Sequence, residues 1–126
     1  MARPTVTTDD RRALGDFGEQ VAQRWYRERG AEVLAQNWRV REGEIDLVVR
    51  LRGALVFVEV KTRRSVRFGL PIEAITPAKA SRLRRLAGLW IAAHPSVRAR
   101  SVRIDIASVL VERGSAPRVD VVTLDV

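Results

Sequence analysis

The sequence predicts an α/β fold in which a helix, three strands, a second helix and two further strands follow one another. Two segments show the spacing of apolar residues that is typical of helices, and two apolar-rich segments are joined by Arg52-Gly53, which is typical of a tight hairpin turn. At 126 residues, with 46% hydrophobic and 30% charged residues, the chain has the size of one domain and the composition of a globular protein.

The first helix is expected from about residue 10 to residue 29. Its apolar residues recur every three or four positions and would form one face: Leu14, Phe17, Val21 and Trp25. Asp9 or Asp10 can cap its first turn, and Gly30 is suited to end it. Residues 1–9 show no such period, so we expect a flexible N-terminal tail there and a single domain over residues 10–126.

Three strands are expected next, over residues 33–40, 44–51 and 54–61. Glycine as the second residue of Arg52-Gly53 favours a two-residue hairpin loop between the second and third of these strands. Residues 64–75 contain glycine and proline and are expected to form a loop.

The second helix is expected to begin after Thr76, because threonine is a good N-cap and Pro77 suits the first helical position. Its apolar face continues to about Ala93, and His94-Pro95 would end it. Two strands, over residues 101–111 and 118–124, would complete the fold.

The chain carries 23 lysine and arginine residues against 15 aspartate and glutamate residues, a net charge of +8. Such a basic balance favours a polyanionic partner such as nucleic acid. With no cysteine and one histidine, the sequence excludes a disulfide framework, a thiolate metal site and a multi-histidine zinc site. It shows neither a signal-peptide pattern nor an apolar run long enough to span a membrane, so we expect a cytoplasmic protein without a membrane partner.

Among the 23 basic residues only Lys61 and Lys79 are lysines. An ammonium group differs from a guanidinium group in being compact and able to lower its pKa enough to transfer protons. Lys61 and Lys79 are therefore candidates for positions where arginine would not function. The alternative is that chance left them as lysines.

The predicted hairpin places four charged residues on one face of the sheet. A two-residue loop at Arg52-Gly53 makes the numbers of opposed residues sum to 105. Asp46 then faces Glu59, and Glu44 faces Lys61. Because strand side chains alternate, these four share one face. The other face would carry core residues: Ile45, Leu47, Val49, Val56, Val58 and Val60.

Two carboxylates that face each other on neighbouring strands destabilise a sheet unless a shared proton or a cation lies between them. Mg²⁺ prefers oxygen ligands and keeps several waters, so Asp46 and Glu59 would suit it, with Glu44 as a third candidate metal ligand of the acidic cluster and Mn²⁺ able to substitute. Lys61 could orient or deprotonate a metal-bound water, or balance charge in the transition state. The alternative is a set of ordinary strand charges in which Glu44 and Lys61 form a surface ion pair.

Asp46, twelve intervening residues and then Glu59-Val60-Lys61 resemble the PD-(D/E)XK motif of restriction-endonuclease-like nucleases. Further segments carry the resemblance: Gly15–Glu19, Gly43–Leu47, Val58–Arg63, Phe68-Gly69, and Pro77 with Lys79. Together they resemble the YraN-like family of small bacterial proteins, which is grouped with Holliday-junction-resolvase-like nucleases. Ile45 stands where the motif has proline, which is often missing in divergent members.

The resemblance implies a restriction-endonuclease-like core of three layers, with helices flanking a central mixed β-sheet. It implies that Asp46 and Glu59 are metal ligands, that Lys61 is the catalytic lysine, and that Glu19 on the first helix completes the catalytic site. By sequence geometry alone, Glu19 at the edge of the apolar face would more simply be a solvated residue.

Basic residues flank the predicted site along the chain and are expected to bind phosphates of nucleic acid: Arg63, Arg64, Arg67, Lys79, Arg82 and Arg85. Lys79 lies at the start of the second helix, an end that attracts anions. The alternatives are that Lys79 only extends past the edge of the core, and that the arginines form a solvated face.

The sequence thus predicts Mg²⁺-dependent hydrolysis of phosphodiester bonds in DNA, with branched or structured DNA as the substrate that the resemblance implies. The alternative is a non-catalytic nucleic-acid-binding protein with a vestigial nuclease site. A membrane-surface protein fits poorly, because neither predicted helix combines a basic face with a large exposed apolar one. Cleavage of a four-way junction would call for a homodimer.

Overall fold

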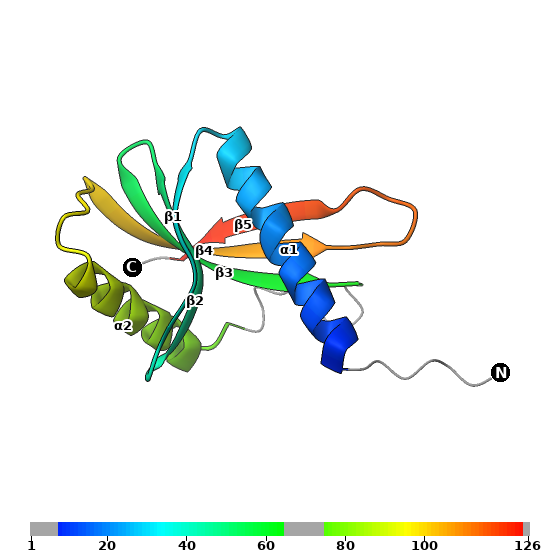
Figure 1. Ribbon diagram of the computed structural model, residues 1–126, viewed down its shortest axis with the longest axis horizontal. Helices are drawn as coiled ribbons and strands as arrows, with labels where there is room; N and C mark the ends of the chain where they lie inside the picture. Colours follow the sequence, from blue (N-terminus) through cyan, green and yellow to red (C-terminus); the bar gives the residue numbers. More distant parts are fainter. Residues whose placement is uncertain (1–7, 65–74, 125–126) are drawn as a thin grey trace.

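The computed structural model describes residues 8–64 and 75–124, which form two helices and five strands in the predicted order (Figure 1). The elements are α1 (Thr8–Glu28), β1 (Glu32–Val40), β2 (Gly43–Leu51), β3 (Ala54–Arg63), α2 (Pro77–Ala93), β4 (Ser101–Leu110) and β5 (Arg118–Thr123). The α/β class and the order of elements are therefore confirmed, and each boundary lies within two residues of its expected place.

The five strands form one mixed sheet in the order β1-β2-β3-β4-β5. Neighbouring strands are antiparallel except for β3 and β4, which run parallel along the whole of β3. The chain crosses from β3 to β4 through α2, as a parallel connection requires. The central strand β3 therefore has a partner on each side.

The two helices cover opposite faces of the sheet, which gives the expected three layers (Figure 1). Ala22 and Tyr26 of α1 are buried in a cluster with residues of β2, β3 and β4. Leu86 and Trp90 of α2 are buried in a second cluster on the other face. Within the described ranges, neither helix is both long and apolar enough to cross a membrane.

The predicted signals at the β2–β3 turn and at both ends of α2 are present in the structure, whereas the predicted cap of the first helix is wrong: Asp9 and Asp10 lie inside α1, which begins at Thr8. Arg52 and Gly53 have φ angles of 52° and 81°, as a type I′ hairpin turn requires. The side chain of Thr76 accepts a hydrogen bond of 3.1 Å from the backbone N–H of Lys79, and Pro77 occupies the first turn of α2. His94 is the C-cap of α2, as the sequence indicated.

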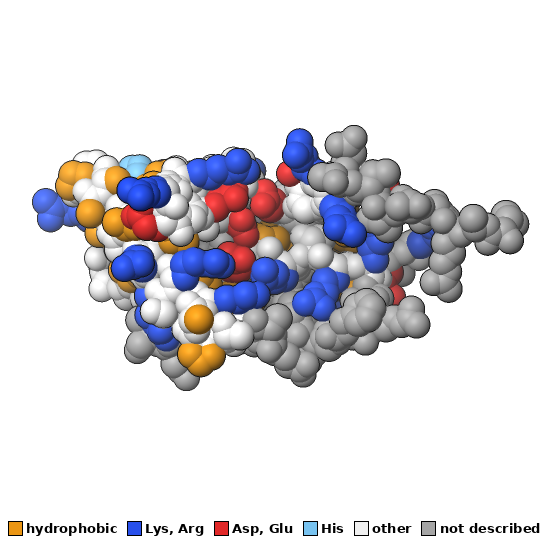
Figure 2. Space-filling model, turned by 90° about the horizontal axis from the view of Figure 1, so that it is seen from below, with side chains coloured by type: hydrophobic (Ala, Val, Ile, Leu, Met, Phe, Trp, Pro, Cys, Tyr) orange, Lys and Arg blue, Asp and Glu red, His pale blue; other side chains and the backbone are white. Residues whose placement is uncertain are grey.

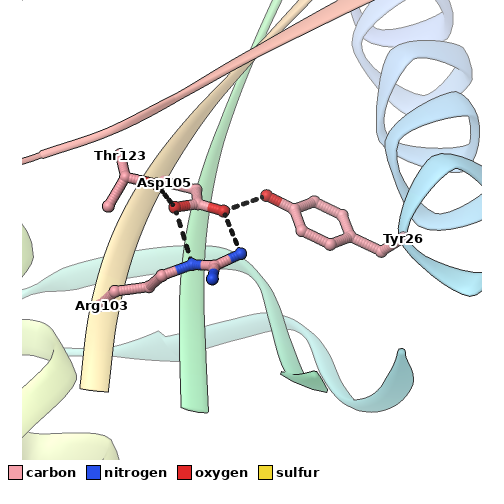
Figure 3. A network of polar contacts seen from close by, with 4 residues as sticks. All are labelled: Tyr26, Arg103, Asp105 and Thr123. Atoms are coloured by element: carbon pink, nitrogen blue, oxygen red, sulfur yellow. Dashed lines mark hydrogen bonds and ion pairs between the residues drawn. The ribbon is translucent and has the colours of Figure 1, made fainter. Parts of the chain in front are cut away.

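A buried polar network ties α1 to β4 and β5 (Figure 3). The fully buried carboxylate of Asp105 accepts hydrogen bonds from the hydroxyl groups of Tyr26, at 2.6 Å, and Thr123, at 2.7 Å. Arg103 pairs with it, with 3.2 Å between Nε and Oδ1. Burial and the neighbouring Asp105 carboxylate raise the pKa of Tyr26, so its hydroxyl stays protonated and donates. The network fixes the C-terminal half of α1 on the sheet.

The N-terminal half of α1 approaches the sheet most closely at Gly18. A Cβ atom at this position would overlap the side chain of Thr62 on β3, so only glycine fits without movement of one of the two elements. Thr62 follows Lys61 directly, and Gly18 precedes Glu19. This contact therefore brings the α1 segment that carries Glu19 against the β3 segment that carries Lys61.

We expect Gly18→Ala to lower the free energy of unfolding by about 1–3 kcal/mol, because the added methyl group forces α1 away from Thr62. Gly15→Ala is the matched control, since no atom lies within 4 Å of a Cβ at that position. It should stabilise the protein by about 0.5–1 kcal/mol through helix propensity. Urea unfolding followed by circular dichroism measures both, and equal effects of the two changes would contradict the close approach.

Candidate functional site

Strands β2 and β3 part at Asp46. Their paired residues run from Leu51↔Ala54 to Leu47↔Val58, with the predicted sum of 105. Beyond Leu47 the Asp46 carboxylate itself accepts a hydrogen bond of 2.8 Å from the backbone N–H of Val60. The expected direct pairings of Asp46 with Glu59 and of Glu44 with Lys61 are therefore wrong, because a side chain satisfies the N–H that would continue the ladder.

The regular alternation of side chains also breaks at Asp46. Ile45 packs in the α2-side cluster, whereas Leu47 packs in the α1-side cluster. The expectation that these two residues share one core face is therefore wrong. On β1, Asn37 lies between the residues paired with Leu47 and Ile45, and it has a positive φ of 49°. Both strands thus depart from the regular pleat at the same level.

Four carboxylates interact at this point: Glu19, Glu44, Asp46 and Glu59, together called the acidic site below. The pKa of Asp46 is raised to about 7, chiefly by burial and then by the charge of Glu59. Glu19 and Glu44 contribute smaller increases, and the hydrogen bond from Val60 partly offsets the rise. An aspartate with this pKa is poised between its acid and its anion near neutral pH.

Glu19 reaches the acidic site from α1. Burial raises its pKa, and the charge of Glu44 adds to the effect. A hydrogen bond from the side chain of Asn37 lowers it. Glu19 is therefore half-buried and close enough to the carboxylates of β2 to interact with them, rather than the solvated residue that sequence geometry alone favoured.

Two cations contact the acidic site. The Nζ atom of Lys61 lies 3.4 Å from Oε1 of Glu59, whose side chain is only 17% exposed. Glu44 pairs with Arg39 of β1, at 3.5 Å between Nε and Oε1. The alternative interpretation of Glu44 and Lys61 as one surface ion pair is therefore wrong.

The sequence analysis did not identify Asn37 and Arg39, although a signal for them was present. The hairpin of β1 and β2 pairs Val40 with Gly43, so its opposed residues sum to 83 and Arg39 faces Glu44. The register arithmetic applied to β2 and β3 would have found this pair on β1. The left-handed backbone at Asn37 has no comparable signal in the sequence.

The donor set can be compared with the needs of a divalent cation. Across residues 8–64 and 75–124, no three side chains of Asp, Glu, His or Cys form a group that could hold a metal ion. Mg²⁺, however, is commonly held by one or two carboxylates together with waters. Asp46 and Glu59 meet this requirement in number and type, and Glu59 and Glu44 each also contact a cation, Lys61 and Arg39 respectively.

Basic side chains border a group of acidic side chains on the molecular face shown in Figure 2. Of the residues predicted to bind nucleic acid, Arg64, Arg82 and Arg85 are exposed. Arg63 at the end of β3 and Lys79 in the first turn of α2 are half-buried. Arg67 lies outside the described residues, as does the Phe68-Gly69 segment.

We expect the stability of the protein to fall as the pH rises from about 4 to about 7. The pKa of Asp46 is raised in the folded state, so folding retains a proton that the unfolded chain releases. Between pH 5 and pH 8, wild type should lose about 2 kcal/mol more than Asp46→Asn, which keeps an acceptor for Val60 without the charge. Urea unfolding in the presence of a chelator measures this difference.

The control for this measurement is Asp120→Asn, which removes an exposed carboxylate from β5. This variant should lose as much stability as wild type over the same pH range. If Asp46→Asn behaves in the same way as Asp120→Asn, the protonation of Asp46 does not contribute to stability.

Comparison with known proteins places this chain in a family. The model of "Uncharacterised protein family UPF0102" matches residues 18–124. A UPF0102 protein of Beutenbergia cavernae is 54% identical over 108 residues, covering 86% of this chain and 91% of the relative. A UPF0102 protein of Nocardia farcinica is 47% identical over 122 residues, covering 95% of each chain. The chain therefore belongs to the UPF0102 family, the YraN-like family that its motifs resemble.

Proposed function

We propose that the protein is a metal-dependent nuclease that hydrolyses phosphodiester bonds of DNA. The observation that carries the proposal is the partly buried carboxylate of Asp46 on β2, which interacts with the carboxylate of Glu59. Glu59 lies on β3, the strand that also carries Lys61. Burying two interacting carboxylates costs free energy unless a proton or a cation compensates their charge. The chain has a net charge of +8, yet it places these carboxylates close together. A divalent cation bound between them would compensate their charge.

Asp46 and Glu59 would hold Mg²⁺ or Mn²⁺, and a bound ion would supply Lewis-acid polarisation of a phosphate oxygen and a more acidic water. The bond from Val60 fixes the position of the Asp46 carboxylate for this purpose. Glu59 keeps its other contact with Lys61. The two ligands thus come from neighbouring strands at the point where those strands part.

Lys61 is the residue assigned to the reacting phosphate. Its ammonium group lies beside Glu59 and is 30% exposed, so it can contact a substrate that enters from solvent. There it would balance the negative charge that builds on the phosphate during hydrolysis. Glu19, held near Asp46 on α1, would orient the attacking water by accepting a hydrogen bond.

The basic residues bind the flanking phosphates in this proposal. Arg82 and Arg85 are exposed on α2, and the neighbouring Leu86 packs beside Gly43 at the start of β2. They therefore lie on the helix that borders the β2 end of the site. Arg64 follows β3 directly, three residues after Lys61. Such contacts position a nucleic acid without reading its sequence.

One observation favours the alternative of a nucleic-acid-binding protein with a vestigial site. The described residues include no group of three side chains that could hold a metal ion, and Arg39 forms an ion pair with Glu44. The basic residues would serve such a binding protein equally well. The two functions differ in whether Asp46 and Lys61 are needed for any event after binding.

We expect the purified protein to cut four-way-junction, single-stranded or duplex DNA with Mg²⁺ or Mn²⁺, and to cut none of them with a chelator. Lys61→Ala and Asp46→Asn should lower the cleavage rate at least about 100-fold while retaining binding. Asp120→Asn on β5 is the control that keeps the wild-type rate. Cleavage of no substrate by wild type, or equal cleavage by Lys61→Ala, would contradict the enzyme and favour the binding protein.

Binding should be tested separately with the double variant Arg82→Ala/Arg85→Ala. If these side chains contact two phosphates, the slope of log affinity against log salt for duplex DNA should become shallower by about 1–2. Fluorescence anisotropy over a range of salt concentrations measures the slope. Arg118→Ala, an exposed arginine on β5, is the control. If the double variant shows a slope as steep as that of wild type, Arg82 and Arg85 do not contact phosphates, and α2 is not part of the nucleic-acid interface.

A further inference from the structure

Arg39 combines a contact with the acidic site and a high exposure to solvent. It lies on the edge strand β1, directly opposite Glu44 of β2. Its Nε atom is 3.5 Å from Oε1 of Glu44, yet 77% of the Arg39 side chain is exposed. An exposed ion pair of this kind contributes little to the stability of a protein. Stability therefore does not account for a guanidinium group at this position.

A second arginine–glutamate pair on the same two strands provides a comparison. Arg50 of β2 faces Glu32 of β1 at the other end of the hairpin. An Nη2 atom of Arg50 donates a hydrogen bond of 2.7 Å to Oε2 of Glu32, and the Arg50 side chain is 37% exposed. Arg39 is held less closely and is more exposed, so its guanidinium group can still donate hydrogen bonds to a ligand from solvent.

Arg39 and Lys61 border the acidic site from two sides. Strand β2, which carries Glu44 and Asp46, lies between β1 and β3 in the sheet. Arg39 contacts Glu44 from β1. Lys61 contacts Glu59 on β3. A phosphodiester backbone that crosses the acidic site from β3 to β1 would therefore meet a cation on each side of it.

The chemistry of Arg39 suits the backbone of a nucleic acid. A guanidinium group is planar and can donate two parallel hydrogen bonds to two oxygens of one phosphate, whereas an ammonium group acts as a point charge. In the free protein the carboxylate of Glu44 contacts this guanidinium. Because an exposed ion pair is weak, a phosphate can replace Glu44 as the partner of Arg39.

We propose that Arg39 is a phosphate-binding residue on the β1 side of the acidic site, which exchanges its contact with Glu44 for a backbone phosphate of a nucleic acid. The inference deepens the proposed function and rests on it for the identity of the ligand. The nucleic-acid-binding residues predicted from the sequence lie on β3, on α2 or between these elements. Arg39 would extend the interface to the hairpin of β1 and β2.

The test must distinguish a phosphate contact from a simple effect on charge. Arg39→Ala in the wild-type chain also leaves Glu44 without its cation, which would increase the repulsion of DNA. The comparison is therefore made in a Glu44→Gln background, which has no carboxylate at this position. If Arg39 acted only by compensating Glu44, its removal from this background would not change the binding of DNA.

Fluorescence anisotropy with duplex DNA and a chelator, over a range of salt concentrations, measures the binding. In the Glu44→Gln background, Arg39→Ala should make the slope of log affinity against log salt shallower by about 1, as the loss of one phosphate contact requires. Arg50→Ala is the matched control, because it removes the same charge from the other end of the hairpin and should keep the slope of the background. Thermal unfolding confirms that the variants are folded. Equal slopes for Arg39→Ala and Arg50→Ala would overturn the inference.

The outcomes for this inference and for the proposed function are separate, because the binding measurement contains no divalent cation. If wild type cuts no DNA but Arg39→Ala changes the slope, the nuclease is contradicted and the phosphate contact of Arg39 stands. If wild type cuts DNA and Arg39→Ala leaves the slope of the background unchanged, the nuclease stands and Arg39 does not bind a phosphate.

Discussion

The hydrogen bond from Val60 to the carboxylate of Asp46 determines how the centre of this sheet is built. In a regular hairpin the N–H groups of β3 that face β2 would all bond to backbone carbonyls. Here a side chain accepts one of them, and the paired residues of the two strands end at Leu47↔Val58. β3 stays in the sheet beyond this point because β4 pairs with it as far as Arg63. The strands can therefore part and hold two carboxylates between them without loss of the sheet.

Helix α1 is fixed on this sheet at two points, and Glu19 lies beside one of them. Gly18, in the middle of the helix, allows the close approach to Thr62, and Tyr26 bonds to the buried Asp105 near its C-terminal end. A helix held at two points along its length has little freedom to rotate or slide. The position of Glu19 relative to Asp46 thus follows from the packing of its direct neighbour Gly18 against Thr62.

The charge of the molecule has two opposing parts under the proposed function. A net charge of +8 attracts a polyanion from a distance, whereas the acidic site would repel a phosphate at close range. A divalent cation held by Asp46 and Glu59 would resolve this conflict, since its two positive charges would offset those of the two carboxylates. Lys61 already provides part of that compensation through its contact with Glu59.

The sequence by itself determined the elements of this protein, because helical periodicity, the Arg52-Gly53 turn and the Thr76-Pro77 cap are local signals that act over a few residues. It also brought Asp46, Glu59 and Lys61 to one region through register arithmetic. Only the tertiary structure decided that Asp46 bonds Val60 and that Glu19 of α1 lies near the carboxylates of β2. The first depends on the end of the β2–β3 pairing, and the second depends on the packing of α1 on the sheet. Contacts between residues far apart in the chain stabilise both arrangements, so local sequence patterns do not reveal them.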